Sequence, residues 1–425
     1  MTGTVRPIGA IAADSGRLTA LIERFAALSE PGRGPGVTRL AYSPLERAAH
    51  AVFAEEMTAL GIRVWTDAAG NTIAERPGTD PTLPAIGIGS HLDSVPNAGT
   101  FDGILGVAAA METARQLTER EIVHRHPVRF VVFAAEEGAR FAQACTGSLL
   151  AAGLIGSADL DHQVDPDGIT LTEAMSAVGL DPGGVESARW SASNWAAFVE
   201  LHIEQGPTLE SLGRRLGVVD TVSGSTRVRL DLRGRAAHTG ASPMRLRADA
   251  LAAAAEIVLL VESVAHQTAE LGTRATVGKL TVAPNSMTTI AGEVSLCVDV
   301  RELDGDRQQR VAAEIVERAG GVCARRGIAM RAETLAEALP VALSPSVREV
   351  LATACRSLDI EPVVLPSGAS HDAQQVSHVT PTGMIFIPSR DGISHDPAEW
   401  SSAEDIALGA TALATAILHL DTALD

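Results

Sequence analysis

The sequence predicts an α/β protein in which a mostly parallel sheet is flanked by helices and a smaller α+β domain is inserted into the chain. Three observations support this fold class. The chain has 425 residues, more than one hydrophobic core usually holds, so two domains are expected. Residues 85–89, 104–117 and 128–135 form a strand, helix, strand pattern, and the second strand is apolar throughout, as in a sheet covered on both faces. Between about residues 217 and 333 the apolar periodicity changes.

The elements of the larger domain are predicted from apolar spacing along the chain. Ser43-Pro44 supplies the cap and first-turn residues of the second helix, and the turn-forming residues 67–71 indicate a hairpin. The predicted elements are helices at 18–28 and 45–60, strands at 62–65, 72–74 and 85–89, a helix at 104–117, strands at 128–135, 198–203, 362–365 and 384–387, and a helix at 407–418 packed on the body of the protein.

The inserted segment has its own order of elements. Alternating apolar and polar residues predict its strands, and two long stretches have helical spacing. The elements are a strand at 226–232, a helix at 248–264, strands at 276–282 and 293–300, a helix at 307–318 and a strand near 328–332. This order is typical of a small ferredoxin-like domain. We therefore expect one domain of residues 1–216 and 334–425, and an inserted domain of residues 217–333.

Composition and charge exclude several classes of protein. With 46% hydrophobic and 20% charged residues, the chain is too apolar to be disordered. Its formal net charge of -18 repels phosphate backbones and anionic lipid, so we expect neither nucleic-acid nor membrane binding. The 4 cysteines form no C-x-x-C pair, and the apolar patch at residues 8–13 is too short for a secretory signal. A cytoplasmic location is therefore expected.

Side chains of the types that bind metals follow the predicted strands of the larger domain. In open parallel sheets, ligands gather beyond the carboxyl ends of the strands. The residues expected at that edge are His91, Asp93, Asp102, Glu136, Glu137, His202 and His395. Imidazole and carboxylate donors suit Zn, Mn, Co or Ni.

Each of these residues also has a competing interpretation. A lone histidine is more often a hydrogen-bonded buried side chain, and Asp102 alone would be an ordinary helix cap. The adjacent pair Glu136-Glu137 favours a bound cation, because an apolar strand delivers two carboxylates to its buried end. A surface turn is the alternative for that pair.

Six motifs carry a family resemblance over nearly the whole chain. In order they are GSHLDSVPNAGTFDGILGV, AAEEGARF, ELHIEQGP, GRAAHTGASPMRLRADAL, SGASHDA and GISHDPAEW. Together they resemble the N-carbamoyl-L-amino acid hydrolases and allantoate amidohydrolases, the hydantoinase/carbamoylase-type branch of the two-metal aminoacylase and carboxypeptidase superfamily. The resemblance implies a di-zinc aminopeptidase-like catalytic domain and an inserted lid domain that closes over the site and dimerises.

The resemblance also implies two divalent metal ions per chain and their ligands. One ion would be bound by His91 and His202, the other by Glu137 and His395, and both by the bridging Asp102. Zinc is the expected metal, with manganese, cobalt or nickel as alternatives.

Further roles follow from the same resemblance. Asp93 would orient His91, as a metal-bound imidazole usually requires, and Glu136 would be the general base. His238 would stabilise the oxyanion, and Arg301 would clamp a substrate carboxylate in bidentate fashion. The other implied substrate contacts are Gln205, Asn285, Thr288 and Ser370. The competing interpretations are a surface histidine for position 238 and, for Arg301, a surface ion pair with Asp299 or Glu302.

The sequence departs from the family pattern in its substrate-binding motifs. Relatives usually read P-N-x-x-N-x-x-P-G where this chain has residues 284–292, so the second Asn is replaced by Thr288. The family's G-Q is Gly224-Ser225 here, and Ser370 replaces a glycine in S-G-A-G-H-D. The metal ligands match the family, whereas the residues expected to contact substrate have changed.

The combined interpretation is a dimeric, cytoplasmic, two-metal amidohydrolase that acts on a small carboxylated ureido or amide compound. The expected substrate is an N-carbamoyl-L-amino acid, cleaved to the amino acid, carbon dioxide and ammonia. Alternative activities are hydrolysis of allantoate, or of N-acyl or peptide bonds by an aminoacylase or dipeptidase. The alternative outside enzymes is a catalytically inactive binding protein of the same fold, which would not need Glu136 as a general base.

Overall fold

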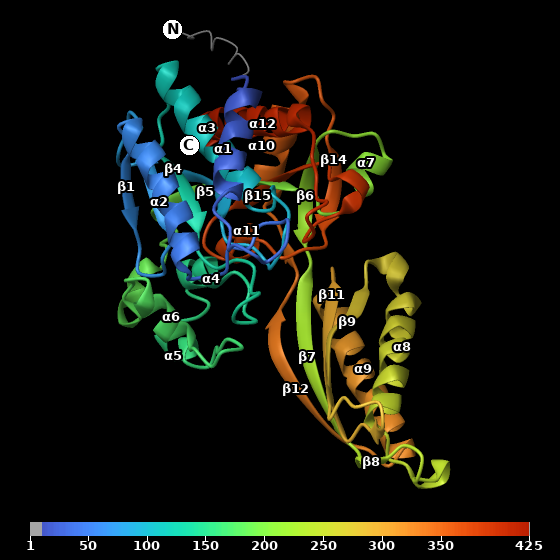
Figure 1. Ribbon diagram of the computed structural model, residues 1–425. Helices are drawn as coiled ribbons and strands as arrows, with labels where there is room; N and C mark the ends of the chain where they lie inside the picture. Colours follow the sequence, from blue (N-terminus) through green and yellow to red (C-terminus); the bar gives the residue numbers. More distant parts are fainter. Residues whose placement is uncertain (1–10, 425) are drawn as a thin grey trace. The chain divides into compact units, whose positions relative to one another are not determined.

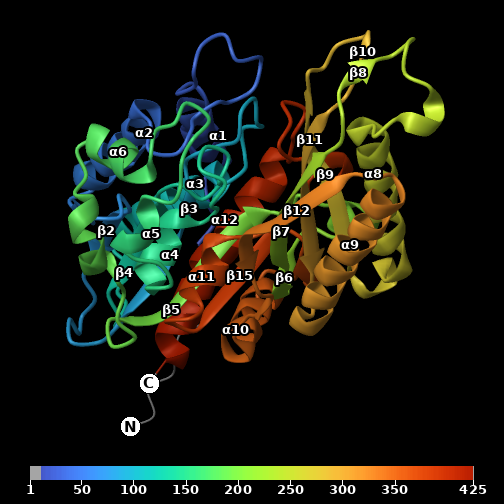
Figure 2. The same ribbon diagram turned by 90° about the horizontal axis from the view of Figure 1, so that it is seen from below.

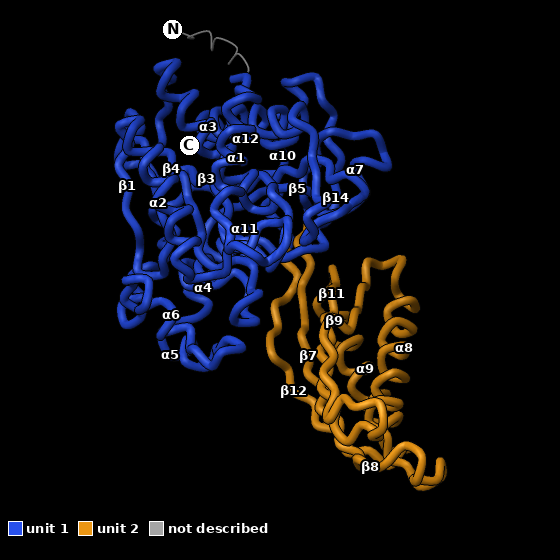
Figure 3. The backbone as a smooth tube through the Cα atoms, in the orientation of Figure 1, with its two compact units in different colours: residues 1–220, 342–425 blue, residues 221–341 orange. Residues whose placement is uncertain are grey.

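The computed structural model describes residues 11–424, which divide into two compact units. Unit 1 contains residues up to 220 together with residues from 342 onwards, and unit 2 contains residues 221–341 (Figure 3). Both boundaries differ from the predicted positions 217 and 333. The first differs because strand β6 (Gly217–Val222) pairs in the large sheet, and the second because the last strand of unit 2, β12, continues to Ala338.

Unit 1 is built on a nine-stranded mixed sheet with the order β1-β2-β4-β3-β5-β15-β6-β13, and β14 also pairs with β6. The central strands β4, β3, β5 and β15 are parallel, whereas β1–β2, β2–β4 and β15–β6 are antiparallel. The predicted parallel arrangement is therefore confined to the centre. Besides β6, the strands are β1 (Arg63–Thr66), β2 (Thr72–Arg76), β3 (Ala85–His91), β4 (Val128–Phe133), β5 (Trp195–Ile203), β13 (Val341–Ala342), β14 (Val363–Ser367) and β15 (Thr382–Ile387).

Helices cover both faces of this sheet. On β5, Leu201 lies next to Gly409 of α12, whereas the adjacent Glu200 accepts a hydrogen bond from the main chain of Ala373 in α11. Because neighbouring strand residues point to opposite faces, these two helices lie on opposite sides of the sheet. The helices are α1 (Ser15–Ala26), α2 (Pro44–Ala59), α3 (Ile104–Glu119), α4 (Thr146–Ala152), α5 (Ser157–Leu160), α6 (Leu171–Ala177), α7 (Thr208–Ser211), α10 (Pro345–Arg356), α11 (Asp372–Val376) and α12 (Ala403–Ala423), with short 3-10 turns η1 (Pro182–Ala188) and η4 (Arg390–Gly392).

The main core of unit 1 lies between the sheet and helices α1, α3, α10 and α12. Helix α12 contains the predicted helix at 407–418, and 72% of its most apolar window is buried, as expected of a core helix. By length and composition, α12 and α8 (Ala250–Gln267) are both long and apolar enough to cross a membrane, but only 33% of the window in α8 is buried. A larger share of the apolar surface of α8 than of α12 is therefore exposed.

Unit 2 is a four-stranded antiparallel sheet with the order β12-β7-β11-β9. Helices α8 and α9 lie side by side on one face of it (Figures 1 and 2). The elements are β7 (Gly224–Arg233), α8, β9 (Arg274–Ala283), β11 (Glu293–Glu302), α9 (Gly305–Arg325) and β12 (Ala329–Ala338), with the short ribbon β8 (Ala237–His238) and β10 (Thr289–Ile290) and the turns η2 (Met244–Leu246) and η3 (Ala269–Leu271). The order strand, helix, two strands, helix, strand is the order read from the sequence.

Candidate active site

The predicted metal-binding side chains meet at the carboxyl ends of the parallel strands of unit 1. His91 is the last residue of β3, and His202 is the next-to-last residue of β5. Glu136 and Glu137 follow β4 after a turn at Ala135, where the backbone φ of 56° takes the chain out of the strand. Two loops complete the cluster. Asp102 lies just before α3, and His395 lies in the loop after β15.

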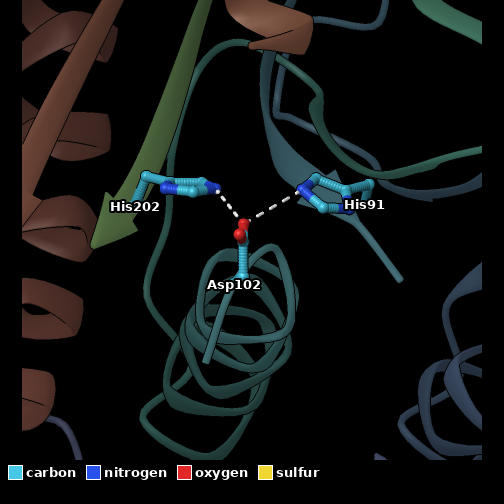
Figure 4. Close-up of side chains that lie close together, drawn as sticks. All are labelled: His91, Asp102 and His202. Carbon is cyan, nitrogen blue, oxygen red and sulfur yellow. Dashed lines mark ion pairs between the residues drawn. The ribbon is translucent and has the colours of Figure 1, made fainter. Parts of the chain in front are cut away.

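Asp102 lies at the centre of this cluster, and each of its carboxylate oxygens faces a different group. Oδ1 is 3.2 Å from Nε2 of His202 and 3.6 Å from Nε2 of His91. Figure 4 shows the carboxylate between these two imidazoles. Oδ2 is 3.3 Å from Nε2 of His395, and the same nitrogen is 3.3 Å from Oε2 of Glu137. The arrangement is that of a carboxylate shared by two sets of donors.

A glycine next to Asp102 allows this close packing. Gly103 has φ of 66°, and a Cβ at this position would lie 2.5 Å from the ring of His91. A larger residue would therefore be strained in its backbone and would displace His91. The motif GTFDG thus supplies both the carboxylate and the space for the neighbouring imidazole.

The electrostatics of the cluster favour positive charge at its centre. Burial disfavours the charged form of His91, yet its contacts with Asp102 and Asp93 raise its pKa well above the ordinary value. The carboxylate of Asp102 raises the pKa of His395 to about 9. Burial, together with the nearby Asp102 charge, raises the pKa of Glu137 well above its usual range. Imidazoles that hold protons, together with the Glu137 carboxyl that resists ionisation, indicate a negative local field, which suits cations.

Asp93 fixes the two glutamates that follow β4. Its Oδ1 accepts a hydrogen bond from the main-chain N–H of Glu136 at 2.9 Å, and its Oδ2 accepts one from Glu137 at 3.0 Å. Its carboxylate also lies 3.5 Å from Nδ1 of His91, and its main-chain oxygen is 3.2 Å from the same nitrogen. Asp93 therefore contacts His91, as predicted, and also holds the turn that carries Glu136.

Glu136 lies beside the cluster without being part of either set of donors. It is 6% exposed, and its Oε2 is 3.8 Å from Nε2 of His91. Its other oxygen accepts a hydrogen bond from the thiol of Cys145 at 3.1 Å. Burial raises its pKa, so this carboxylate is better able to hold a proton than an exposed glutamate is.

The cluster contains two sets of candidate metal-ligand atoms. Two sets, His91, Asp102 and His202, and Asp102, Glu137 and His395, each bring ligand atoms within 4.8 Å of one another. Oε1 of Glu137 is buried without a hydrogen-bond partner. An unpaired buried polar atom is costly, so a ligand on this oxygen would relieve an unfavourable state.

A third group of potential donors, Glu200, His202 and His371, is different. The two oxygens of Glu200 accept hydrogen bonds from the Ser90 hydroxyl at 2.7 Å and from the main chain of Ala373 at 2.9 Å. Nε2 of His371 is 2.8 Å from the hydroxyl of Ser367. The candidate ligand atoms of Glu200 and His371 are already hydrogen-bonded, so this group does not fit a further ion.

Sequence reasoning missed a polar network around Asp102. Gln205, predicted as a substrate contact, donates through Nε2 to Oδ2 of Asp102 at 2.7 Å and to the hydroxyl of Ser394 at 3.1 Å. Ser394 in turn donates to Oε2 of Glu399 at 2.7 Å. Both Ser394 and Glu399 lie in the motif GISHDPAEW, so the signal was their position beside His395.

Two of the predicted substrate contacts lie in the β8–β10 ribbon of unit 2. His238 pairs with Thr289, next to Thr288, whose main-chain oxygen accepts hydrogen bonds from Thr239. Nδ1 of His238 accepts main-chain hydrogen bonds from Gly240 at 3.0 Å and Ala241 at 3.1 Å. The neutral ring therefore carries its proton on Nε2, where it can be donated to a ligand.

The remaining predicted contacts are dispersed. Asn285 lies in the exposed turn before β10, and Ser370 lies between β14 and α11 in unit 1. Arg301 is on β11, directly opposite Ser225 of β7. Its Nε donates to Oδ2 of Asp299 at 2.9 Å, which is one of the ion pairs considered as its alternative role. Ser225, at the position of the family's glutamine, thus neighbours Arg301.

Comparison with known proteins finds similarity over nearly the entire chain. The model of peptidase family M20/M25/M40 matches residues 87–419. The N-carbamoyl-L-amino acid amidohydrolase of Geobacillus stearothermophilus is 42% identical, and the alignment covers 92% of this chain and 96% of that protein. The corresponding enzyme of Paenarthrobacter aurescens is 40% identical, with 94% and 96% covered. A crystal structure of a hydantoinase/carbamoylase family amidase from Burkholderia vietnamiensis is 33% identical, with a TM-score of 0.89 and 97% and 98% covered.

Proposed function

Since the chain belongs to peptidase family M20/M25/M40 and is a metal-dependent amidohydrolase of the ureido type, we propose that its substrate is an N-carbamoyl-L-amino acid. Hydrolysis of the carbamoyl C–N bond would give the amino acid, carbon dioxide and ammonia. The names of two relatives with 40% and 42% identity support this substrate class. The observation that carries the proposal is the shared carboxylate of Asp102 with the buried Glu136 beside it.

The proposed cofactor is a pair of divalent ions, with zinc as the first candidate and manganese, cobalt or nickel as alternatives. His91 and His202 would hold one ion, Glu137 and His395 the other, and Asp102 both. The two sets of candidate ligand atoms and the buried Oε1 of Glu137, which has no hydrogen-bond partner, support this assignment. When bound, such ions acidify a water molecule and polarise the carbonyl of the substrate.

Glu136 is proposed as the group that moves the proton. Its carboxylate would take a proton from the attacking water and return it to the leaving nitrogen. The raised pKa supports this role, because a base that must also act as an acid works best when its pKa approaches the working pH. Asp93 would hold the main chain of Glu136 in place. Cys145 would restrict the rotation of its carboxylate.

Six side chains are proposed to recognise the substrate. The guanidinium of Arg301 would bind the amino-acid carboxylate through two parallel hydrogen bonds. His238 would donate its Nε2 proton to the oxygen on which negative charge develops, and its hydrogen bonds from Gly240 and Ala241 support that tautomer. Thr288, Asn285, Ser370 and Gln205 are the other proposed contacts.

The proposal is tested by measuring ammonia release and metal content in the same preparations. The panel is N-carbamoyl-L-amino acids, allantoate, N-acetyl amino acids and dipeptides. We expect ammonia from the carbamoyl compounds at the highest kcat/KM and none from the N-acyl compounds or dipeptides.

Each other result of this substrate panel identifies one of the alternative functions. Preference for allantoate would replace the substrate but keep the reaction class. Amino-acid release without ammonia from N-acetyl compounds or dipeptides would indicate an aminoacylase or a dipeptidase. Tight binding of a panel member without any product would indicate a catalytically inactive binding protein.

We also propose a homodimer formed through unit 2. Among the described residues, strand β9 pairs only with β11, so its other edge is open. Beside it, α8 exposes Leu251 and Leu259, which are 42% and 65% exposed, and Leu280 of β9 is 42% exposed. An open strand edge next to an apolar helix face is suited to a second copy of the same surface.

The dimer is tested by light scattering after size-exclusion chromatography. Leu259→Glu should convert the dimer to a monomer, because it places a charge in the apolar contact. Val123→Glu is the matched control, since Val123 is an exposed apolar residue of unit 1. A monomeric wild-type protein would contradict the proposal.

All four cysteines are free, which supports the proposed cytoplasmic location.

A further inference from the structure

Glu399 is a buried carboxylate that contacts the metal cluster without being one of its proposed ligands. It is 5% exposed. Its Oε1 accepts main-chain hydrogen bonds from Phe101 at 2.9 Å and from Asp102 at 3.1 Å. Its Oε2 accepts a hydrogen bond from the hydroxyl of Ser394, the residue before His395, at 2.7 Å. One side chain thus joins the turn that carries Asp102 to the loop that carries His395.

The glycine at position 99 leaves room for the side chain of Glu399. A Cβ at Gly99 would lie 2.2 Å from Oε1 and 2.4 Å from Cβ of Glu399, so residue 99 must be a glycine while Glu399 occupies its place. The hydroxyl of Ser394 is also 3.2 Å from Oδ2 of Asp102, the oxygen that faces His395. The network therefore ends at the one oxygen of Asp102 that belongs to the second set of donors.

The two sets of donors differ in how their histidines are supported. His91 and His202 belong to central strands and are 2% and 1% exposed. His395 has a side chain that is 49% exposed, lies outside any strand or helix and has a backbone φ of 58°. Its position therefore depends on what holds its loop. Glu399, through Ser394, ties this loop to the main chain of Asp102, and Gln205 joins the same hydroxyl to the Asp102 carboxylate.

We propose that Glu399 is a positioning residue that sets the placement of His395 relative to Asp102 and thereby the affinity of the second metal ion. This inference rests on the proposed function, in which Asp102, Glu137 and His395 hold that ion. Residues that orient metal ligands typically contribute about 10- to 100-fold to metal affinity. The ion held by His91 and His202 should depend on Glu399 much less.

The test is isothermal titration of the metal-free protein with zinc, with bound zinc counted after dialysis. Glu399→Ala should keep one ion with wild-type affinity and weaken the other by about 10- to 100-fold. Glu399→Gln should restore the second ion, because its amide oxygen can still accept the hydrogen bonds from Phe101 and Asp102 and its NH2 group can donate to Ser394.

A matched control separates this role from general stabilisation. Asp421 is also a buried carboxylate that accepts main-chain hydrogen bonds, from Arg125 and His126, in another part of unit 1. Asp421→Ala should lower the melting temperature and leave both ions bound. If Glu399→Ala does not fold, Ser394→Ala serves instead. It removes the hydroxyl that joins Glu399 to the loop of His395, together with that hydroxyl's contacts to Gln205 and Asp102, and should weaken the same ion.

The affected ion is identified in two backgrounds. In His395→Ala, which should retain only the first ion, adding Glu399→Ala should leave its affinity unchanged. In His91→Ala, adding Glu399→Ala should weaken the ion that remains. Two ions of unchanged affinity in both Glu399→Ala and Ser394→Ala, or equal losses at both ions, would overturn the inference. A wild-type protein that binds only one ion would instead overturn the proposed function.

Discussion

The candidate metal-binding cluster of unit 1 and the ribbon that carries His238 in unit 2 differ in how firmly neighbouring residues hold their side chains. In the cluster, Asp102 contacts three histidines and Gln205, and it is 6% exposed. In the ribbon, Thr288 is exposed, and the adjacent Met287 is 96% exposed. The comparison teaches that Asp102, which matches the family motif, is buried and cross-linked. Thr288, which departs from the motif, is exposed, where substitutions cost little stability.

The largest expected effect comes from removing the centre of the cluster. Asp102→Ala should reduce bound metal from two ions to none and abolish turnover, because both sets of donors share this carboxylate. His395→Ala, by contrast, should lose one ion only. Metal is counted by mass spectrometry after dialysis. An Asp102→Ala protein that still holds two ions would show that the carboxylate is not shared.

Next in size is the effect of the proposed base. Glu136→Gln should keep both ions and lower kcat by about 10²- to 10⁴-fold, the range that general bases contribute. The neighbouring Glu137→Gln is the control and should show the opposite pattern in metal content, since it should lose an ion. Steady-state kinetics and metal analysis check both variants. Wild-type kcat in Glu136→Gln would remove this residue from the mechanism.

In unit 2, the expected effects are smaller and concern binding. Arg301→Lys keeps the charge but loses the two-pronged guanidinium, so it should raise KM for carboxylated substrates by about 10-fold, equal to ~1.4 kcal/mol of binding. Arg229→Lys, on the same sheet and paired with Glu333, should leave KM unchanged. An unchanged KM in Arg301→Lys would mean that the carboxylate is bound elsewhere.

The smallest expected effect is a shift in selectivity. Thr288→Asn restores the amide that the family has at this position, so the ratio of kcat/KM between ureido and other amide substrates should rise several-fold, on the order of one hydrogen bond. Ser286→Asn adds the same side chain in the same exposed loop and should change nothing. Equal ratios in wild type and Thr288→Asn would show that this residue does not set selectivity.

The sequence predicted the family, the α/β fold and the strand ends from which the ligands project, and these fold and family predictions are confirmed. Continuous apolar runs make such strands visible, and metal-binding residues right after them are a strong signal. The hairpin of β1 and β2 was predicted from its turn residues. The antiparallel pairing of β2 with β4 and of β6 with β15 was not, because strand direction depends on pairing partners far away in the chain. The contacts of Gln205 and Glu399 with Asp102 were missed for the same reason, since they join segments more than 100 residues apart.

Because Asp102 and Glu399 are far apart in the sequence, they are also synthesised at different times. The two residues are 297 positions apart, so at about 5 to 20 residues per second a ribosome makes the second roughly 15 to 60 s after the first. From the addition of His202 until the addition of His395, the emerging polypeptide has His91, Asp102, Glu137 and His202 but no His395. In the proposed two-ion site, the ion assigned to His395 would therefore bind only after the whole of unit 2 has been translated.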